Sequence, residues 1–192
     1  MTNVIKTTKG LDIPIDGAAQ KMIERTVISD IVALVPDYYH GIIPKVLVRA
    51  GDRVKAGTPV FHDKIHENLN IVSPVSGKVL AVNRGEKRKL INITIERDVV
   101  NEYENFGHPS LESLSGEEIK SALLKAGIWP YIKQRPYDVI ANPNKTPKSI
   151  FISSFDTAPL APDYNFILKG QFADFQTGID ALAKLTPGKV HL

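Results

Sequence analysis

Two short segments between residues 45 and 82, each built around glycine and proline, constrain the fold of this chain more than any other feature. The first spans residues 51–59 and reads GDRVKAGTP, and the second spans residues 74–79 and reads PVSGKV. Each combines turn-forming residues with apolar residues that suit a strand. Short strands separated by closely spaced turns are typical of a β-sandwich or barrel. We therefore expect a β-sandwich over residues 25–98, after a polar lead-in over residues 1–24.

Together the two segments resemble the biotinyl/lipoyl-type β-sandwich, also called a barrel-sandwich hybrid. In carrier proteins with this fold, a lysine at a hairpin tip receives biotin or lipoate at a fixed distance before the proline of the second segment. Counting back eight residues from Pro74 leads to His66, and the nearest lysine, Lys64, lacks flanking methionines. His66 thus replaces the carrier lysine, and we predict no covalent prosthetic group on this chain. A biotin or lipoate carrier is the alternative, which an added mass would reveal.

The histidines at positions 62 and 66 are four residues apart, a spacing that would form a metal-binding pair on a helix. The surrounding sequence instead predicts a strand and a hairpin, where this spacing does not bring the two imidazoles together. The sequence offers no carboxylate–histidine arrangement that would orient either ring. We therefore expect His62 and His66 to be exposed hairpin histidines, and we expect no metal site.

Residues 77–83 and 89–96 predict an antiparallel hairpin at the end of the sandwich. Apolar and polar side chains alternate over residues 91–95, the period of a half-buried strand. The basic turn between the two strands, residues 84–88, is expected to be a solvated tip. Elsewhere the positive residues are spread out and the net charge is only +3, so we expect no nucleic-acid partner.

The composition excludes several kinds of chemistry. Hydrophobic residues make up 43% of the chain and charged residues 23%, as in ordinary soluble domains. The absence of cysteine excludes disulfides, thiolate zinc sites, iron–sulfur ligation and thiol catalysis within the chain. No apolar run approaches the roughly 20 residues that span a bilayer. No Ser/His/Asp set, Walker-type loop or Gly-x-Gly-x-x-Gly segment is present, so we predict no catalytic residues in this chain.

Beyond residue 98 the pattern changes to that of an α/β protein. Ser115 and Glu118 form a capping box and Gly127 supplies a stop, which predicts a helix over residues 115–127. A proline-rich connection completes residues 99–148. A buried strand over residues 149–154, a helix over 171–185 and a strand starting at 189 are expected to follow. This order predicts an incomplete Rossmann-like α/β unit over residues 149–192.

The segment after the helix stop is rich in aromatic and cationic side chains. A flat ring such as a quinone could lie between aromatic groups while a cation donates a hydrogen bond to its carbonyl. The alternative is that Trp129 and Tyr131 only fasten the helix to the next domain. The candidate quinone-binding residues are Trp129, Tyr131, Lys133, Arg135 and Tyr137.

The whole chain resembles the N-terminal portion of the NqrA family, one of the subunits of the Na+-translocating NADH:quinone reductase. The resemblance rests on the sandwich segments and on residues 9–17 (KGLDIPIDG), 83–88 (NRGEKR), 128–129 (IW), 135–136 (RP), 146–152 (TPKSIFI) and 155–161 (FDTAPLA). It implies a peripheral subunit on the cytoplasmic side of the bacterial inner membrane, in a complex that passes electrons from NADH to a quinone and exports sodium. It also implies flavins and iron centres on partner subunits, and a position for this chain at the quinone-reducing end.

Two further alternatives stay open. The first is the equivalent subunit of a ferredoxin-linked ion-pumping complex, against which the missing cysteines and glycine-rich loop count. Residues 129–135 stand where related subunits carry that flavin-binding loop, and their bulk cannot close on a phosphate as glycines do, so we predict no flavin mononucleotide here. The second alternative is a stand-alone biotinyl/lipoyl-type interaction domain without a catalytic role.

Overall fold

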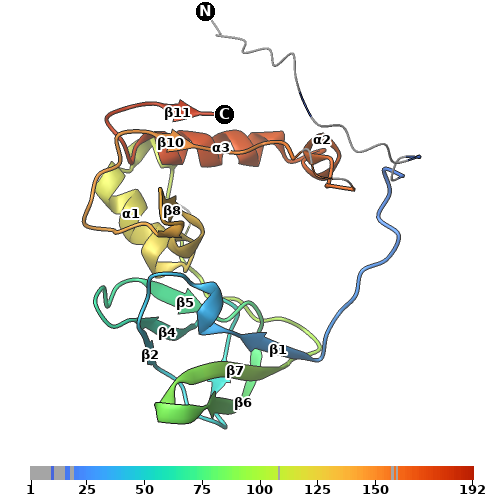
Figure 1. Cartoon of the computed structure of the whole chain (residues 1–192), viewed down its shortest axis with the longest axis vertical. Helices are drawn as coiled ribbons and strands as arrows, with labels where there is room; N and C mark the ends of the chain where they lie inside the picture. Colours follow the sequence, from blue (N-terminus) through green and yellow to red (C-terminus); the bar gives the residue numbers. More distant parts are fainter. Residues whose placement is uncertain (1–9, 11–15, 18–19, 108, 157, 159) are drawn as a thin grey trace, which may run out of the picture.

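The computed structural model describes residues 10, 16–17, 20–107, 109–156, 158 and 160–192. Most of the predicted lead-in, and with it most of the resembling segment at residues 9–17, lies outside these residues. Figure 1 shows a group of β-strands at one end of the molecule and α3 with β10 and β11 at the other, with α1 and β8 between them.

Two antiparallel sheets form the β-sandwich that the sequence predicts. The four-stranded sheet has the order β1-β7-β6-β3, and the three-stranded sheet has the order β2-β4-β5. The strands of the first sheet are β1 (Ile31–Leu34), β7 (Leu90–Arg97), β6 (Gly77–Arg84) and β3 (Arg53–Val54). Those of the second are β2 (Pro44–Val46), β4 (Pro59–Asp63) and β5 (Asn70–Val72). The short helix η1 (Pro36–Tyr38) follows β1.

The hairpin of β6 and β7 confirms the predicted strand pair and its alternation. Ile93 and Ile95 of β7 and Val79 of β6 are fully buried, whereas Ile91 is 47% exposed. Full burial of such a side chain stabilises the fold by about 1.5–3 kcal/mol. The turn between the strands contains η2 (Glu86–Arg88), and its charged side chains are exposed, as expected for a solvated tip.

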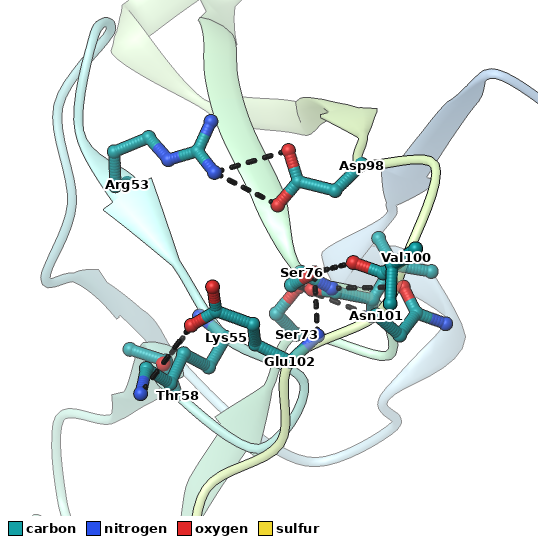
Figure 2. A network of polar contacts seen from close by, with 10 residues as sticks. Arg53, Lys55, Thr58, Ser73, Ser76, Asp98, Val100, Asn101 and Glu102 are labelled. Carbon is teal, nitrogen blue, oxygen red and sulfur yellow. Dashed lines mark hydrogen bonds and ion pairs between the residues drawn. The ribbon is translucent and has the colours of Figure 1, made fainter.

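Hydrogen bonds and ion pairs hold the segment that leaves the sandwich, residues 98–104, against the two glycine-containing turns (Figure 2). The guanidinium of Arg53 pairs with both carboxylate oxygens of Asp98, at 3.1 and 2.9 Å. The Ser76 hydroxyl accepts a bond from the Glu102 backbone amide at 2.9 Å. Ala56 donates its amide to the Glu102 carbonyl at 2.9 Å and accepts from the Glu104 amide at 2.8 Å. Residues 98–104 are therefore part of the sandwich rather than a loose linker.

Helix α1 (Gly116–Lys125) lies within the predicted span of 115–127 and begins with the predicted capping box. The Ser115 hydroxyl accepts from the Glu118 amide, and the Glu118 carboxylate accepts from the Ser115 amide at 2.8 Å. The chain leaves the helix at Gly127 with a φ of 70°, a value that favours glycine. The short helix η3 (Leu111–Ser113) precedes α1.

After α1 the chain forms η4 (Trp129–Tyr131) and a short hairpin of β8 (Lys133–Gln134) and β9 (Val139–Ile140). This part shares one hydrophobic core with the sandwich. Leu124, Trp129 and Ile140 belong to the same buried cluster as the sandwich residues Phe61 and Ile71.

The C-terminal part contains α2 (Tyr164–Ile167), α3 (Phe172–Ala183) and two parallel strands, β10 (Ile150–Phe151) and β11 (Val190–His191). The order strand, helix, strand is confirmed. The prediction of a buried strand over residues 149–154 is wrong, because β10 has two residues and Phe151 is 77% exposed. An apolar strand is buried only where other elements cover it, and Phe151 instead stacks on His191 at 4.7 Å. No helix in the described part of the chain is long and apolar enough to cross a membrane.

Candidate functional site

The position of the carrier lysine lies in the turn between β4 and β5. These strands pair antiparallel, with His62 opposite Asn70, and His66 lies in the turn that joins them, as the sequence predicts. Lys64 is exposed in the same turn. Glu67 points to Lys45 of β2, with a distance of 3.1 Å between Nζ and Oε1.

A buried carboxylate, Asp63, organises this turn. It is 2% exposed and accepts a bond from the Ile43 amide at 2.9 Å. Its Oδ2 accepts from the His66 amide at 3.0 Å and lies 2.9 Å from Nδ1 of the His66 ring. Burial by itself would raise the pKa of Asp63, but the hydrogen bonds from Ile43 and His66 hold that pKa below its ordinary value. Asp63 is therefore ionised at neutral pH and orients the His66 imidazole.

Two predictions for the histidines are wrong. They are not exposed: His62 is 5% exposed, and the side chain of His66 is 20% exposed. A carboxylate does orient one of them, because Asp63 binds His66. The register of β4 and β5 shifts between Pro59 and Phe61, so the simple alternation of the strand fails, and η4 packs against β5. Among the described residues no three His, Asp or Glu side chains are grouped to hold a metal ion.

A cleft of about 220 Å³ lies between the β4–β5 turn and the β8–β9 hairpin. One wall comes from the sandwich and the other from residues that follow it by about 70 positions in the sequence. The polar residues lining it are Asp63, His66, Gln134, Asn142 and Lys145, and the remaining ones are Gly41, Ile42, Leu69, Val139, Ile140 and Ala141.

The structure does not bring the five candidate quinone-binding residues together around one cavity. Trp129 is 4% exposed, and its indole Nε1 donates to the Ala141 carbonyl at 2.7 Å. This ring belongs to the core, where it fastens the segment to the sandwich. Tyr131 and Tyr137 are instead 78% and 81% exposed.

The two candidate cations lie on the outer side of the β8–β9 hairpin. Lys133 and Arg135 are exposed, whereas Gln134 between them lines the cleft. Successive side chains of a strand point to opposite faces, which explains this separation. Lys133, Arg135 and the two exposed tyrosines are thus open to a ligand or partner from outside the cleft.

The sequence reasoning missed Asp63, Gln134, Asn142 and Lys145. Asp63 precedes His66 by three residues at the start of a turn, where an aspartate side chain can bind the backbone amide of a following residue. That spacing was an available signal for the Asp63–His66 pair. The other three residues are brought to the cleft by tertiary packing, which no local pattern encodes.

Comparison with known proteins identifies both parts of the chain. Residues 5–98 match the model of the NqrA N-terminal barrel-sandwich hybrid domain, and residues 114–192 match that of the NqrA second alpha/beta domain. These matches agree with the predicted fold class, a barrel-sandwich hybrid followed by an α/β domain.

Several curated relatives are named as the NqrA subunit of the Na(+)-translocating NADH-quinone reductase. The chain is 39% identical over 191 residues to the protein from Yersinia pseudotuberculosis, 98% of this chain and 43% of the relative. It is 38% identical over 184 residues to that from Pseudomonas aeruginosa, 95% of this chain and 41% of the relative. For Neisseria meningitidis the values are 37%, 191 residues, 98% and 43%. The chain thus spans less than half the length of these relatives, and it belongs to the NqrA family of Na(+)-translocating NADH-quinone reductase subunits.

Proposed function

We propose that this chain forms part of a peripheral subunit of a sodium-pumping NADH:quinone oxidoreductase, on the cytoplasmic side of the bacterial inner membrane. There it contributes to assembly with the other subunits and to the quinone-reducing end. The complex passes electrons from NADH to a quinone and exports sodium, and its flavins and iron centres are carried by partner subunits. The membership of the chain in the NqrA family is the observation that carries this proposal.

The role in assembly is supported by the way the sandwich is fixed to the rest of the chain. A carrier domain needs a free hairpin tip and a mobile connection to bring its group from one site to another. Here the turn that contains His66 forms one wall of a cleft, and residues 98–104 are bonded to the sandwich. Both features suit a rigid docking module better than a carrier.

The quinone contacts are proposed at the outer side of the β8–β9 hairpin. Tyr131 and Tyr137 offer exposed aromatic faces, and Lys133 and Arg135 offer hydrogen-bond donors for a carbonyl oxygen. Trp129 supports this surface from inside the core rather than touching the quinone.

The Arg135→Ala variant of the assembled complex is expected to raise the KM for quinone about tenfold. It removes a charge-assisted hydrogen bond, which contributes about 1.5–3 kcal/mol. NADH oxidation with a soluble one-electron acceptor should be unchanged, because that reaction does not use the quinone site. Arg49→Ala, which removes an exposed arginine of the sandwich, is the matched control. An unchanged quinone KM in Arg135→Ala would contradict the proposed contacts.

The purified chain is expected to have the mass of its unmodified sequence even after co-expression with biotin and lipoate ligases. Lys64 is exposed, but it lies two positions from the site that carriers modify, and His66 at that site cannot form the amide. Intact-mass measurement under denaturing conditions provides the test, with an authentic carrier domain as the positive control. Added biotin or lipoate on Lys64 would establish the carrier function instead.

A further inference from the structure

The Asp63–His66 pair faces the cleft with a hydrogen-bonding atom unused. Nδ1 of His66 lies 2.9 Å from the Asp63 carboxylate, so this side of the ring is occupied. Nε2 lies on the opposite side of the imidazole and has no hydrogen-bond partner among the residues that the structure describes. Because His66 lines the cleft, its ring presents an oriented polar atom to whatever enters.

The size of the cleft limits the ligand to a small molecule or to the head of a larger one. Its volume of about 220 Å³ is below the range of about 300–1,000 Å³ that drug-sized ligands occupy. A single six-membered ring fits this space, whereas a flavin with its phosphate or a dinucleotide does not.

The charges and surfaces of the cleft favour a neutral ligand with hydrogen-bond acceptors. The negative charge of Asp63 and the positive charge of Lys145 balance, so an anion gains little net attraction. Gln134 and Asn142 add amide groups. The apolar side chains of Ile42, Leu69, Val139 and Ile140 offer contact to the faces of a ring.

We propose that this cleft binds a ring ketone of the quinone type, with Nε2–H of His66 donating a hydrogen bond to one carbonyl oxygen. Lys145 donates to the ligand from the other wall, and Asp63 is a positioning residue that holds the imidazole. This inference rests on the proposed function and adds to it a second, inner contact region, on the side of the β8–β9 hairpin opposite to Arg135.

The arrangement makes binding depend on pH. When Nδ1–H donates to Asp63, Nε2 carries a hydrogen only in the imidazolium form, so the donor is lost when His66 loses its proton. The charged and titratable groups around the ring are Asp63 and His62 of β4, Lys64 and Glu67 of the same turn, and Lys145 across the cleft.

The test uses the assembled complex with its full-length subunits and ubiquinone-1 as the probe. His66→Ala is expected to raise the KM for ubiquinone-1 about tenfold at pH ~6, the loss of one hydrogen bond from a charged donor. In the unchanged complex this KM should rise with pH, whereas in His66→Gln it should be nearly independent of pH, because an amide donor does not titrate. A purely structural role for His66 would not flatten the pH profile.

Control variants separate this inference from loss of folding and from failure of the proposed function. Glu67→Gln alters an exposed neighbour that pairs with Lys45, and it should leave the KM unchanged. Lys145→Met changes an exposed turn residue and cannot disturb the core; it should raise the KM severalfold. If Arg135→Ala alters the KM while the His66 and Lys145 variants do not, the inner site is refuted and the proposed function stands. If none of the variants alters it, both are refuted.

Discussion

Replacing Gly77 with alanine is expected to lower the free energy of unfolding by about 3 kcal/mol, the upper end of the usual penalty for overpacking. Gly77 begins β6 and pairs with Arg97 of β7 on one side and Val54 of β3 on the other. A Cβ atom at this position would overlap the backbone carbonyl of Glu96 and lie 3.2 Å from Cα of Arg97. Because both obstacles are backbone atoms held in the sheet, they cannot rotate away as a side chain would.

Urea denaturation followed by circular dichroism measures this change, and Gly178→Ala is its matched control. Gly178 lies inside α3, and a Cβ there would meet no atom within 4 Å. Alanine at that position should stabilise the protein by about 0.5–1 kcal/mol. Equal stabilities of the Gly77 variant and the unchanged protein would mean that β6 and β7 approach less closely than the structure indicates.

Trp129→Ala is expected to lower the free energy of unfolding by about 3–5 kcal/mol, the usual loss for removing a buried aromatic ring. Trp129 belongs to the buried cluster that joins the sandwich to α1 and β9. Its removal also leaves the Ala141 carbonyl without the indole donor. Trp129→Phe keeps most of the apolar contact and should lose only about 1–2 kcal/mol, which measures the missing hydrogen bond.

The same pair of variants tests whether Trp129 contacts a quinone directly. If the ring serves only the core, the KM for quinone should be the same in Trp129→Phe and in the unchanged complex. A large rise in that KM with little loss of stability would instead assign Trp129 to the ligand.

Local rules predicted the elements whose structure depends on neighbouring residues. The β6–β7 hairpin follows from alternation over residues 91–95, and the start of α1 follows from Ser115 and Glu118. The place of His66 in a hairpin turn follows from the spacing to Pro74. In each case the determining contacts lie within a few residues, or within a pattern of turns that sequence displays directly.

The candidate site could not be predicted in the same way, because its walls are distant in sequence. The burial of His62 depends on a register shift and on packing by η4, and neither is visible in the composition of β4. Gln134 and Lys145 reach the cleft only because the β8–β9 hairpin lies against the β4–β5 turn. The exposure of Phe151 has a similar origin, since an apolar run reports a preference for burial but not whether another element provides it.

The bonds that fix residues 98–104 have a consequence for the free energy of ligand binding. A ligand that bridges two loosely tethered units must first order them, and that loss of entropy is subtracted from its affinity. Here Asp98, Glu102 and Glu104 are already bonded to the sandwich, and the shared core around Trp129 holds the second wall in place. The cleft is therefore preorganised, so a weakly polar ring can bind there with few hydrogen bonds.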